Sequence, residues 1–172
     1  MMLGQVNQNW LFVQQASACD ACGREYTQQQ PTKGGSSAMR FMMMVIPKGY
    51  ESAAPDAVPT AEAVAKMMEY NKSLQKAGVL LALDGLFPPS TGARVSYMDG
   101  KPTVTDGPFA DSKEALGGYW IIQVRSREEA IEWAKRAPMS NNEAIDVRQI
   151  HEMSDFPEDV QKAAEGFEQL TR

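Results

Sequence analysis

The amino-acid sequence predicts one α+β domain that follows an N-terminal extension. Short apolar runs typical of strands alternate with segments whose apolar residues recur at helical spacing. An Asp-Gly pair between two strand-like runs indicates a tight hairpin. The first 38 residues are rich in Gln, Asn and Ala and end in a Gly/Ser-containing linker. We therefore place the domain over 39–172 and expect 1–38 to be a disordered extension.

The strand and helix signals follow one another in a regular order. The strand candidates are the apolar runs 39–46, 79–83, 93–98, 101–105, 119–124 and 144–151. Two helices begin behind the capping residues Thr60 and Ser126, and they end at Gly78 and Pro138. A terminal helix is expected over 157–170. The order β-α-β, hairpin, β-α-β, α is that of a ferredoxin-like split βαβ domain with an inserted hairpin.

Three of the predicted strands, 41–46, 79–83 and 119–124, carry apolar residues on both faces. Such a sheet needs a cover on each side, whereas the two internal helices of this fold lie on one side only. The other side is covered either by helix 157–170 or by the sheet of a second subunit. We favour the second subunit, and hence a homodimer, because the terminal helix has few large apolar residues.

Composition excludes several classes of function. Seventeen basic residues against 22 acidic ones give a net charge of −5, the wrong sign for nucleic-acid binding. No apolar run reaches the roughly 18 residues of a membrane span, and the first residues lack a secretory pattern. A single histidine and two cysteines exclude a multi-histidine metal site and a disulfide framework. We expect a cytoplasmic protein with no metal, cofactor, nucleic-acid partner or membrane association.

Cys19 and Cys22 form a C-x-x-C pair inside the extension. A zinc ribbon needs two further ligands, which His151 alone cannot supply. A thioredoxin-like motif needs a strand before it and a helix after it, and neither pattern is present. We therefore expect two inert or incidentally oxidisable thiols.

The most unusual segment is the corner Asp106-Gly107-Pro108-Phe109, which lies between the hairpin and the following strand. Its glycine permits a positive φ or a close backbone approach, and its proline fixes the next φ, so that Phe109 is aimed in one direction. Asp111 or Ser112 can cap a short turn that carries Glu114. The corner is either a rigid turn in which Asp106 caps backbone amides or part of a ligand site.

Residues 104–119 resemble the signature of the DGPF-domain proteins, a branch of the YCII-related family. The similarity continues in 77–81, 85–89, 129–133 and 145–148 and covers about 39–156. It implies a dimeric α/β barrel and suspected small-molecule or lyase-type activity, often encoded near extracytoplasmic-function sigma factors. A His/Asp pair of better-understood relatives does not carry over, because no histidine precedes His151. Asp84 stands where relatives often have Glu.

The candidate site residues are mainly acidic. Alternation along the last strand puts Asp146 and Arg148 on one face, opposite to Ile145 and Val147, which we expect to pack on the helices. Asp146 and Arg148 then face the barrel interior, either as a structural ion pair or as a perturbed acid/base site. We assign candidate catalytic roles to Asp106, Glu114 and Asp146, and substrate-binding roles to Arg148, Tyr119, Phe109 and Asp84.

Two other features receive structural interpretations. Consecutive strand residues face alternately, so the run Met42–Met44 lines a core or a pocket and cannot converge on one metal ion. His151, alone at a strand end, is expected at the surface.

The leading functional hypothesis is a small-molecule-binding protein with carboxylate acid/base chemistry of the lyase or dehydratase type, in which Arg148 holds an anionic substrate. The alternative is a non-catalytic metabolite sensor or interaction protein linked to sigma-factor-dependent transcription control. The sequence does not identify the ligand.

Overall fold

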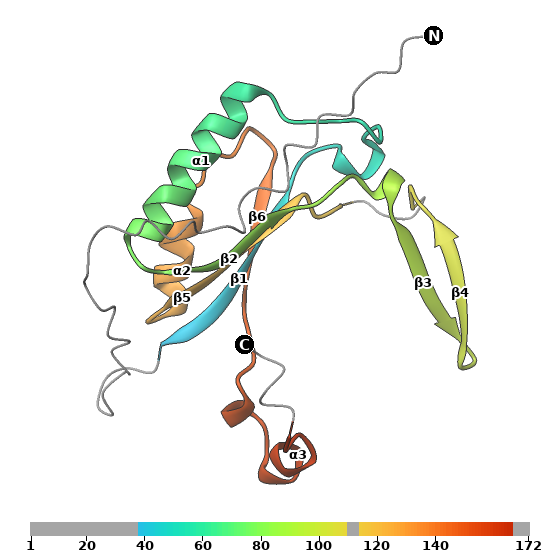
Figure 1. Cartoon of the computed structure of the whole chain (residues 1–172), viewed down its shortest axis with the longest axis vertical. Helices are drawn as coiled ribbons and strands as arrows, with labels where there is room; N and C mark the ends of the chain where they lie inside the picture. The colour runs from blue at the N-terminus through green and yellow to red at the C-terminus, as the bar shows by residue number, and fades with distance from the viewer. Residues whose placement is uncertain (1–37, 110–113, 167–172) are drawn as a thin grey trace, which may run out of the picture. The chain divides into compact units, whose positions relative to one another are not determined.

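The computed structural model describes residues 38–109 and 114–166 (Figure 1). Nearly all of the predicted extension, with Cys19 and Cys22, lies outside these residues, as do Asp111 and Ser112. The described chain forms six strands and three α-helices, in the order β1 (Met39–Ile46), α1 (Ala61–Lys76), β2 (Leu80–Gly85), β3 (Ala93–Met98), β4 (Lys101–Asp106), β5 (Gly118–Val124), α2 (Arg127–Ala134), β6 (Ala144–Gln149) and α3 (Glu158–Ala163).

Four of the strands form one antiparallel sheet in the order β2-β5-β1-β6. Strand β5 lies between β2 and β1, and β1 lies between β5 and β6, so each βαβ unit is split by a strand of the other. The fold is therefore a mixture of helices and antiparallel strands compatible with the ferredoxin-like arrangement that the element order predicts.

Local sequence signals fix the helix ends. The hydroxyl of Thr60 accepts a hydrogen bond from the amide of Ala63 at 3.2 Å, and the hydroxyl of Ser126 accepts one from the amide of Glu129 at 3.1 Å. Each cap satisfies an amide that the first helical turn leaves without a partner. Gly78, with φ of +71°, follows α1 in a conformation that suits glycine.

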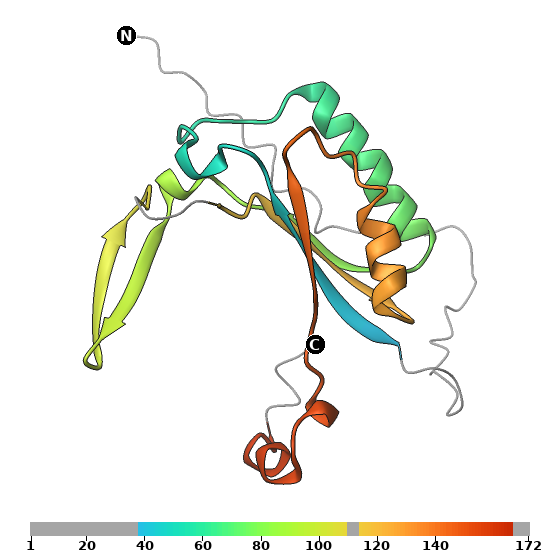
Figure 2. The same cartoon turned by 180° about the vertical axis from the view of Figure 1, so that it is seen from behind.

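Helices α1 and α2 cover one face of the sheet, and the core lies between them and the strands (Figures 1 and 2). Trp120 Nε1 donates a hydrogen bond to the side-chain oxygen Oδ1 of Asn71 at 2.8 Å, and the hydroxyl of Tyr70 donates to the carbonyl of Trp133 at 2.8 Å. These bonds satisfy the polar atoms that the core buries. The buried apolar side chains are those of Phe41, Met43, Tyr70, Leu74, Trp120, Ile122, Val124 and Ala130.

The hairpin β3–β4 forms a separate two-stranded sheet. Its turn residues Asp99 and Gly100 both have positive φ, at 51° and 75°, as a two-residue type I′ turn requires. Every residue of both strands is exposed. The hairpin that the Asp-Gly signal predicts is therefore present, but it projects from the domain instead of extending the main sheet (Figure 1).

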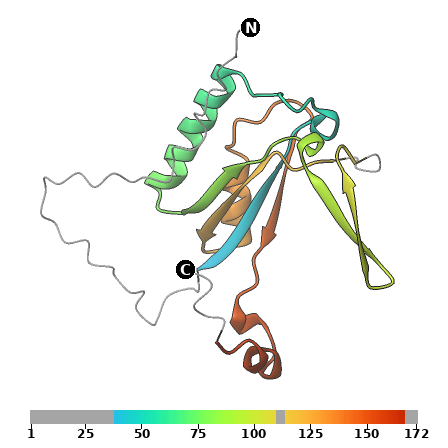
Figure 3. The same cartoon turned by 45° about the vertical axis from the view of Figure 1, so that its right-hand side comes forward.

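The C-terminal helix is the element that differs most from expectation. Its helical part in the described chain is Glu158–Ala163, shorter than the predicted 157–170, and residues 167–170 lie outside the described chain. In three views α3 lies beyond the end of the main sheet and not over it (Figures 1, 2 and 3). The described part of this helix therefore does not cover the second face. None of the described helices is long and apolar enough to cross a bilayer.

Candidate functional site

The face of the main sheet opposite to the helices carries most of the predicted site residues. Directly paired residues of neighbouring antiparallel strands point to the same face. Since Phe41 and Met43 point to the helices, Met42 and Met44 point to the other side, which we call the open face. Two neighbouring rows cross it: one contains Ala82, Ile121, Met42 and Arg148, and the other contains Asp84, Tyr119, Met44 and Asp146.

Asp84 and Tyr119 form a hydrogen-bonded pair on this face. The hydroxyl of Tyr119 donates to Asp84 Oδ2 at 2.9 Å. This hydrogen bond, with smaller contributions from desolvation and from the charge of Asp84, raises the pKa of Tyr119 above its usual value. A β carbon on Gly118 would lie 2.7 Å from the carbonyl oxygen of Asp84, so the glycine allows the two strands to come together here. Tyr119 is therefore a neutral hydroxyl held in place by a carboxylate.

Asp146 and Arg148 lie on the same face but at the other edge of the sheet, on strand β6. Both are exposed in the single chain, because nothing in the described chain covers this face. Their position on the face away from the helices agrees with the predicted alternation, and their burial between two subunits stays a prediction. Within residues 38–109 and 114–166 no salt bridge joins either of them to another group. The structural ion pair between them is therefore not formed, and both charges remain available to a ligand.

Glu114 lies at the end of the open face. It lines a groove of about 210 Å³ whose lining also contains Ile46 and Ala144. These two residues pair with each other one row beyond Met44 and Asp146. The groove therefore continues the open face beyond the row of Asp84 and Asp146, and its lining adds Glu51 and Lys48 beside Glu114.

The Asp-Gly-Pro-Phe corner does not join this group of residues. The amide of Gly107 donates to the carbonyl of Gly92 at 2.9 Å, and a β carbon on Gly107 would overlap the carbonyl oxygen of Pro89. The guanidinium of Arg94 lies 4.2 Å from the ring centre of Phe109. Asp106 is exposed and makes no hydrogen bond with the described residues, so the structure does not show the amide-capping role. The corner needs its glycine for close approach.

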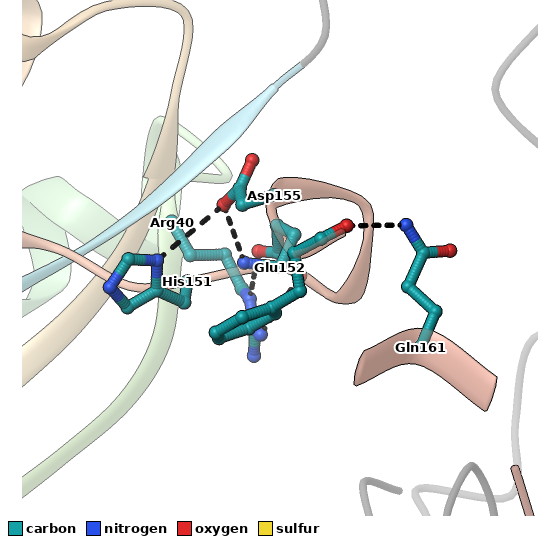
Figure 4. Close-up of polar contacts among 6 residues, drawn as sticks. Arg40, His151, Glu152, Asp155 and Gln161 are labelled. Atoms are coloured by element: carbon teal, nitrogen blue, oxygen red, sulfur yellow. Dashed lines mark hydrogen bonds and ion pairs between the residues drawn. The ribbon is translucent and has the colours of Figure 1, made fainter. Parts of the chain in front are cut away.

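One polar contact of the open face has no counterpart among the sequence-based predictions (Figure 4). Arg40, which shares the open-face alternation of Met42, binds Glu152 through two hydrogen bonds of 2.6 and 3.0 Å. Asp155 in turn accepts a hydrogen bond from the amide of Glu152 at 2.8 Å. No local pattern connects Arg40 with a residue 112 positions away. The contact fastens the C-terminal segment to the start of β1.

His151 lies beside this contact and is exposed, as predicted. Its Nδ1 is 4.0 Å from an oxygen of Asp155, too long for a hydrogen bond. Among the described residues no three His, Cys, Asp or Glu side chains are grouped so that they could hold a metal ion.

Strand order and one-sided helix cover define a small α+β protein with an uncovered sheet face that bears carboxylates, an arginine and a tyrosine. The profile of the YCII-related domain matches residues 39–154. The chain therefore belongs to the YCII-related family, in agreement with the resemblance seen in the sequence.

Two further similarities are weaker. An uncharacterised protein of Rhizobium meliloti (strain 1021) is 35% identical over 66 residues, which cover 38% of this chain and 53% of that protein. The chain thus spans about half the length of this relative. The structure of a GlnK–ATP complex from B. subtilis shares 14% identity at a TM-score of 0.31, over 68% of this chain and 85% of GlnK. This second similarity is too low to support a shared fold or ligand.

Proposed function

We propose that this protein is a cytoplasmic homodimer that binds a small anionic molecule between the open faces of two sheets and catalyses an elimination of the lyase or dehydratase type. The observation that carries the proposal is the arrangement of the open face. Asp84, Tyr119, Asp146 and Arg148 stand on two neighbouring rows around a floor that includes Met42 and Met44. The helices cover only the other face, so a second sheet provides the missing cover.

The proposed chemistry assigns one role to each group. Arg148 binds a carboxylate of the substrate through paired N–H donors. Asp146, its neighbour on the same face, takes a proton from the carbon next to that carboxylate, and the electron pair left behind forms the double bond. The C–O bond of the leaving group breaks as the double bond forms, and the departing oxygen takes up the proton that Asp146 has removed. The hydroxyl of Tyr119 donates its own proton to Asp84, so its oxygen accepts a hydrogen bond from the ligand. Glu114, in the adjoining groove, is the second candidate acid, whereas a role for Asp106 remains a prediction.

The half-buried methionine floor and the exposed Arg148 of the open face also suit the second candidate function, a non-catalytic metabolite sensor. Such a protein needs Arg148 and the methionine floor for binding but needs no base. The two candidates therefore predict the same binding surface and differ in the consequence of removing the carboxylate of Asp146.

The test is a thermal-shift screen of the full chain against small hydroxy acids and other carboxylates, followed by proton NMR of each ligand in deuterated water. A ligand at about 100 times its Kd adds roughly 2.7 kcal/mol to the free energy of unfolding, a shift of several degrees. We expect Arg148→Gln to abolish this shift, whereas Asp159→Asn, an exposed change on α3, leaves it intact. Asp146→Asn should keep the shift but lose exchange or elimination at the ligand.

Two outcomes would contradict the enzymatic proposal. Binding without any exchange or turnover in the wild type would favour the sensor. An equal shift in the wild type and in Arg148→Gln would remove the open face from both candidate functions.

A further inference from the structure

The two faces of the hairpin β3–β4 differ in character. Val95 pairs with Val104, and Tyr97 pairs with Pro102, on one face. Ala93 and Asp106 pair on the same face at the base of the hairpin. The other face carries Arg94, Ser96, Lys101, Thr103 and Thr105, with Met98 beside the turn as its one large apolar side chain. The side chains of Val95, Tyr97 and Val104 are 52, 75 and 65% exposed. The hairpin therefore presents an apolar face, made by Val95, Tyr97, Pro102 and Val104, which nothing in the described chain covers.

The base of the hairpin is held firmly although its strands are exposed. Gly107 donates its amide hydrogen to Gly92 at 2.9 Å across the base. Leu86 donates to Gly117 at 2.9 Å, and Gly117 donates to Val45 at 2.9 Å, which joins the flanking segments to β1. Two views related by half a turn show the hairpin on the side of the sheet away from the helices (Figures 1 and 2). The domain thus holds the base of the hairpin, and covering its apolar face would stabilise the two strands further.

We propose that the apolar face of the hairpin packs on a second copy of this chain, as an arm that completes the cover of the site between the sheets. This inference rests on the homodimer of the proposed function and adds to it the surface that holds the two copies together. The same chain carries an apolar arm and an apolar floor on the open face. A twofold pairing of two copies covers both surfaces on both copies at once.

The area available on the main sheet supports this assignment. Strands of six residues span roughly 20 Å and lie about 4.8 Å apart, so the open face of four strands has a flat area of roughly 400 Å². A stable interface takes roughly 800 Å² from each partner. The open face alone supplies about half of that area, and the hairpin adds further buried surface to the same interface.

The charge of the hairpin is compatible with contact between two copies of this chain. Residues 39–172 carry the whole net charge of −5, so two copies repel one another. The arm contains Arg94 and Lys101 against Asp99 and Asp106, which makes residues 93–106 neutral. The surface that we assign to the contact is therefore one that adds no repulsion.

The test measures the dimer dissociation constant of the full chain by sedimentation equilibrium. The arm variant is V95T/Y97T/V104T, which keeps residues that favour strands but removes apolar surface. The control variant, S96T/T103S/T105S, changes the polar face of the same hairpin. Circular dichroism and urea unfolding establish that each variant folds, and the single change Val95→Thr replaces the triple variant if that one does not.

We expect the arm variant to dimerise at least about tenfold more weakly, and the control to remain within about twofold of the wild type. A dimeric wild type with equal constants for both variants would overturn the arm and leave the dimer of the proposed function intact. A monomeric wild type would overturn both the arm and that dimer. In either case, the thermal-shift comparison of the wild type with Arg148→Gln tests ligand binding to the open face independently of the dimer.

Discussion

The two faces of the main sheet are built from the same strands and differ in every other respect. On the helix side, the side chains of Met43 and Ile122 are fully buried, and the described chain buries no side-chain polar atom without a hydrogen bond. On the open side, Ile121 and Met44 are partly exposed beside the unpaired charges of Asp146 and Arg148. The helix side is complete within one chain. The open side combines partly exposed apolar side chains with charged groups that have no ion-pair partner among the described residues. A surface of this kind is typical of a site for a ligand or a partner.

The sharpest way to break this comparison is to shorten two neighbouring isoleucines of β5. Ile122→Ala leaves a cavity in the core and should lower the free energy of unfolding by about 3 kcal/mol. Ile121→Ala, on the open face, should lower it by less than about 1 kcal/mol in the single chain and weaken dimerisation instead. Urea unfolding at low protein concentration and sedimentation equilibrium measure the two effects. Equal losses of stability would show that the faces are not different in kind.

The next largest effect concerns the buried hydrogen bond of the helix side. Asn71→Leu removes the acceptor of Trp120 Nε1 and leaves a buried N–H without a partner. We expect a loss of about 1–3 kcal/mol in the free energy of unfolding. Lys72→Leu, one residue along α1 and exposed, is the matched control and should change stability little. A stable Asn71→Leu protein would mean that this polar contact does not contribute to the core.

A smaller effect is expected where the open face meets the C-terminal segment. Glu152→Gln weakens the contact between Glu152 and Arg40. The side chain of Arg40 is 37% exposed and that of Glu152 is 40% exposed. Exposed ion pairs contribute little, so the loss should be about 0.5–1 kcal/mol and should shrink at high salt. Limited proteolysis should cut the segment after Gln149 faster in the variant. An unchanged cleavage rate would show that other contacts hold this segment.

How far the sequence alone predicts this molecule follows from the range of the forces involved. Thr60, Ser126 and Asp99-Gly100 act within a few residues, so the helix starts and the hairpin turn are predictable. Alternation along β6 likewise separates Asp146 and Arg148 from Ile145 and Val147. The contact of Arg40 with Glu152 and the overlap that Gly107 avoids with Pro89 depend on tertiary approach, which no local pattern encodes.

The candidate site residues also differ in how far local sequence patterns predict their positions. Asp84, Tyr119, Asp146 and Arg148 share one face because strand order and register put them there. The alternation along β6 predicts that Asp146 and Arg148 face the same way, whereas their neighbours across the sheet depend on the strand order. Asp106 and Phe109 follow a hairpin whose direction the sequence does not specify. They therefore form a corner of their own.

A further expected effect is a pH dependence that belongs to the helix side. Burial raises the pKa of Tyr70 from 10.0 to about 12, although the nearby Arg136 acts in the opposite direction. Between these values the unfolded chain loses the phenolic proton and the folded chain keeps it. The contribution of Tyr70 is therefore fully present below pH 10 and is lost as the pH rises toward 12. Urea unfolding across this range should show a steeper fall for the wild type than for Tyr70→Phe, and parallel curves would contradict the assignment.

The most direct test of the central claim uses three consecutive methionines. With methyl-labelled methionine, a soluble paramagnetic agent broadens the NMR signals of methyl groups that water can reach. Met43 points into the core and should be protected at every protein concentration. If a second copy covers the open face, Met42 and Met44 should be as protected as Met43 in the concentrated dimer and become accessible on dilution. If instead they remain as accessible as the exposed Met153 at all concentrations, the open face is not covered and the account of a site between two sheets is wrong.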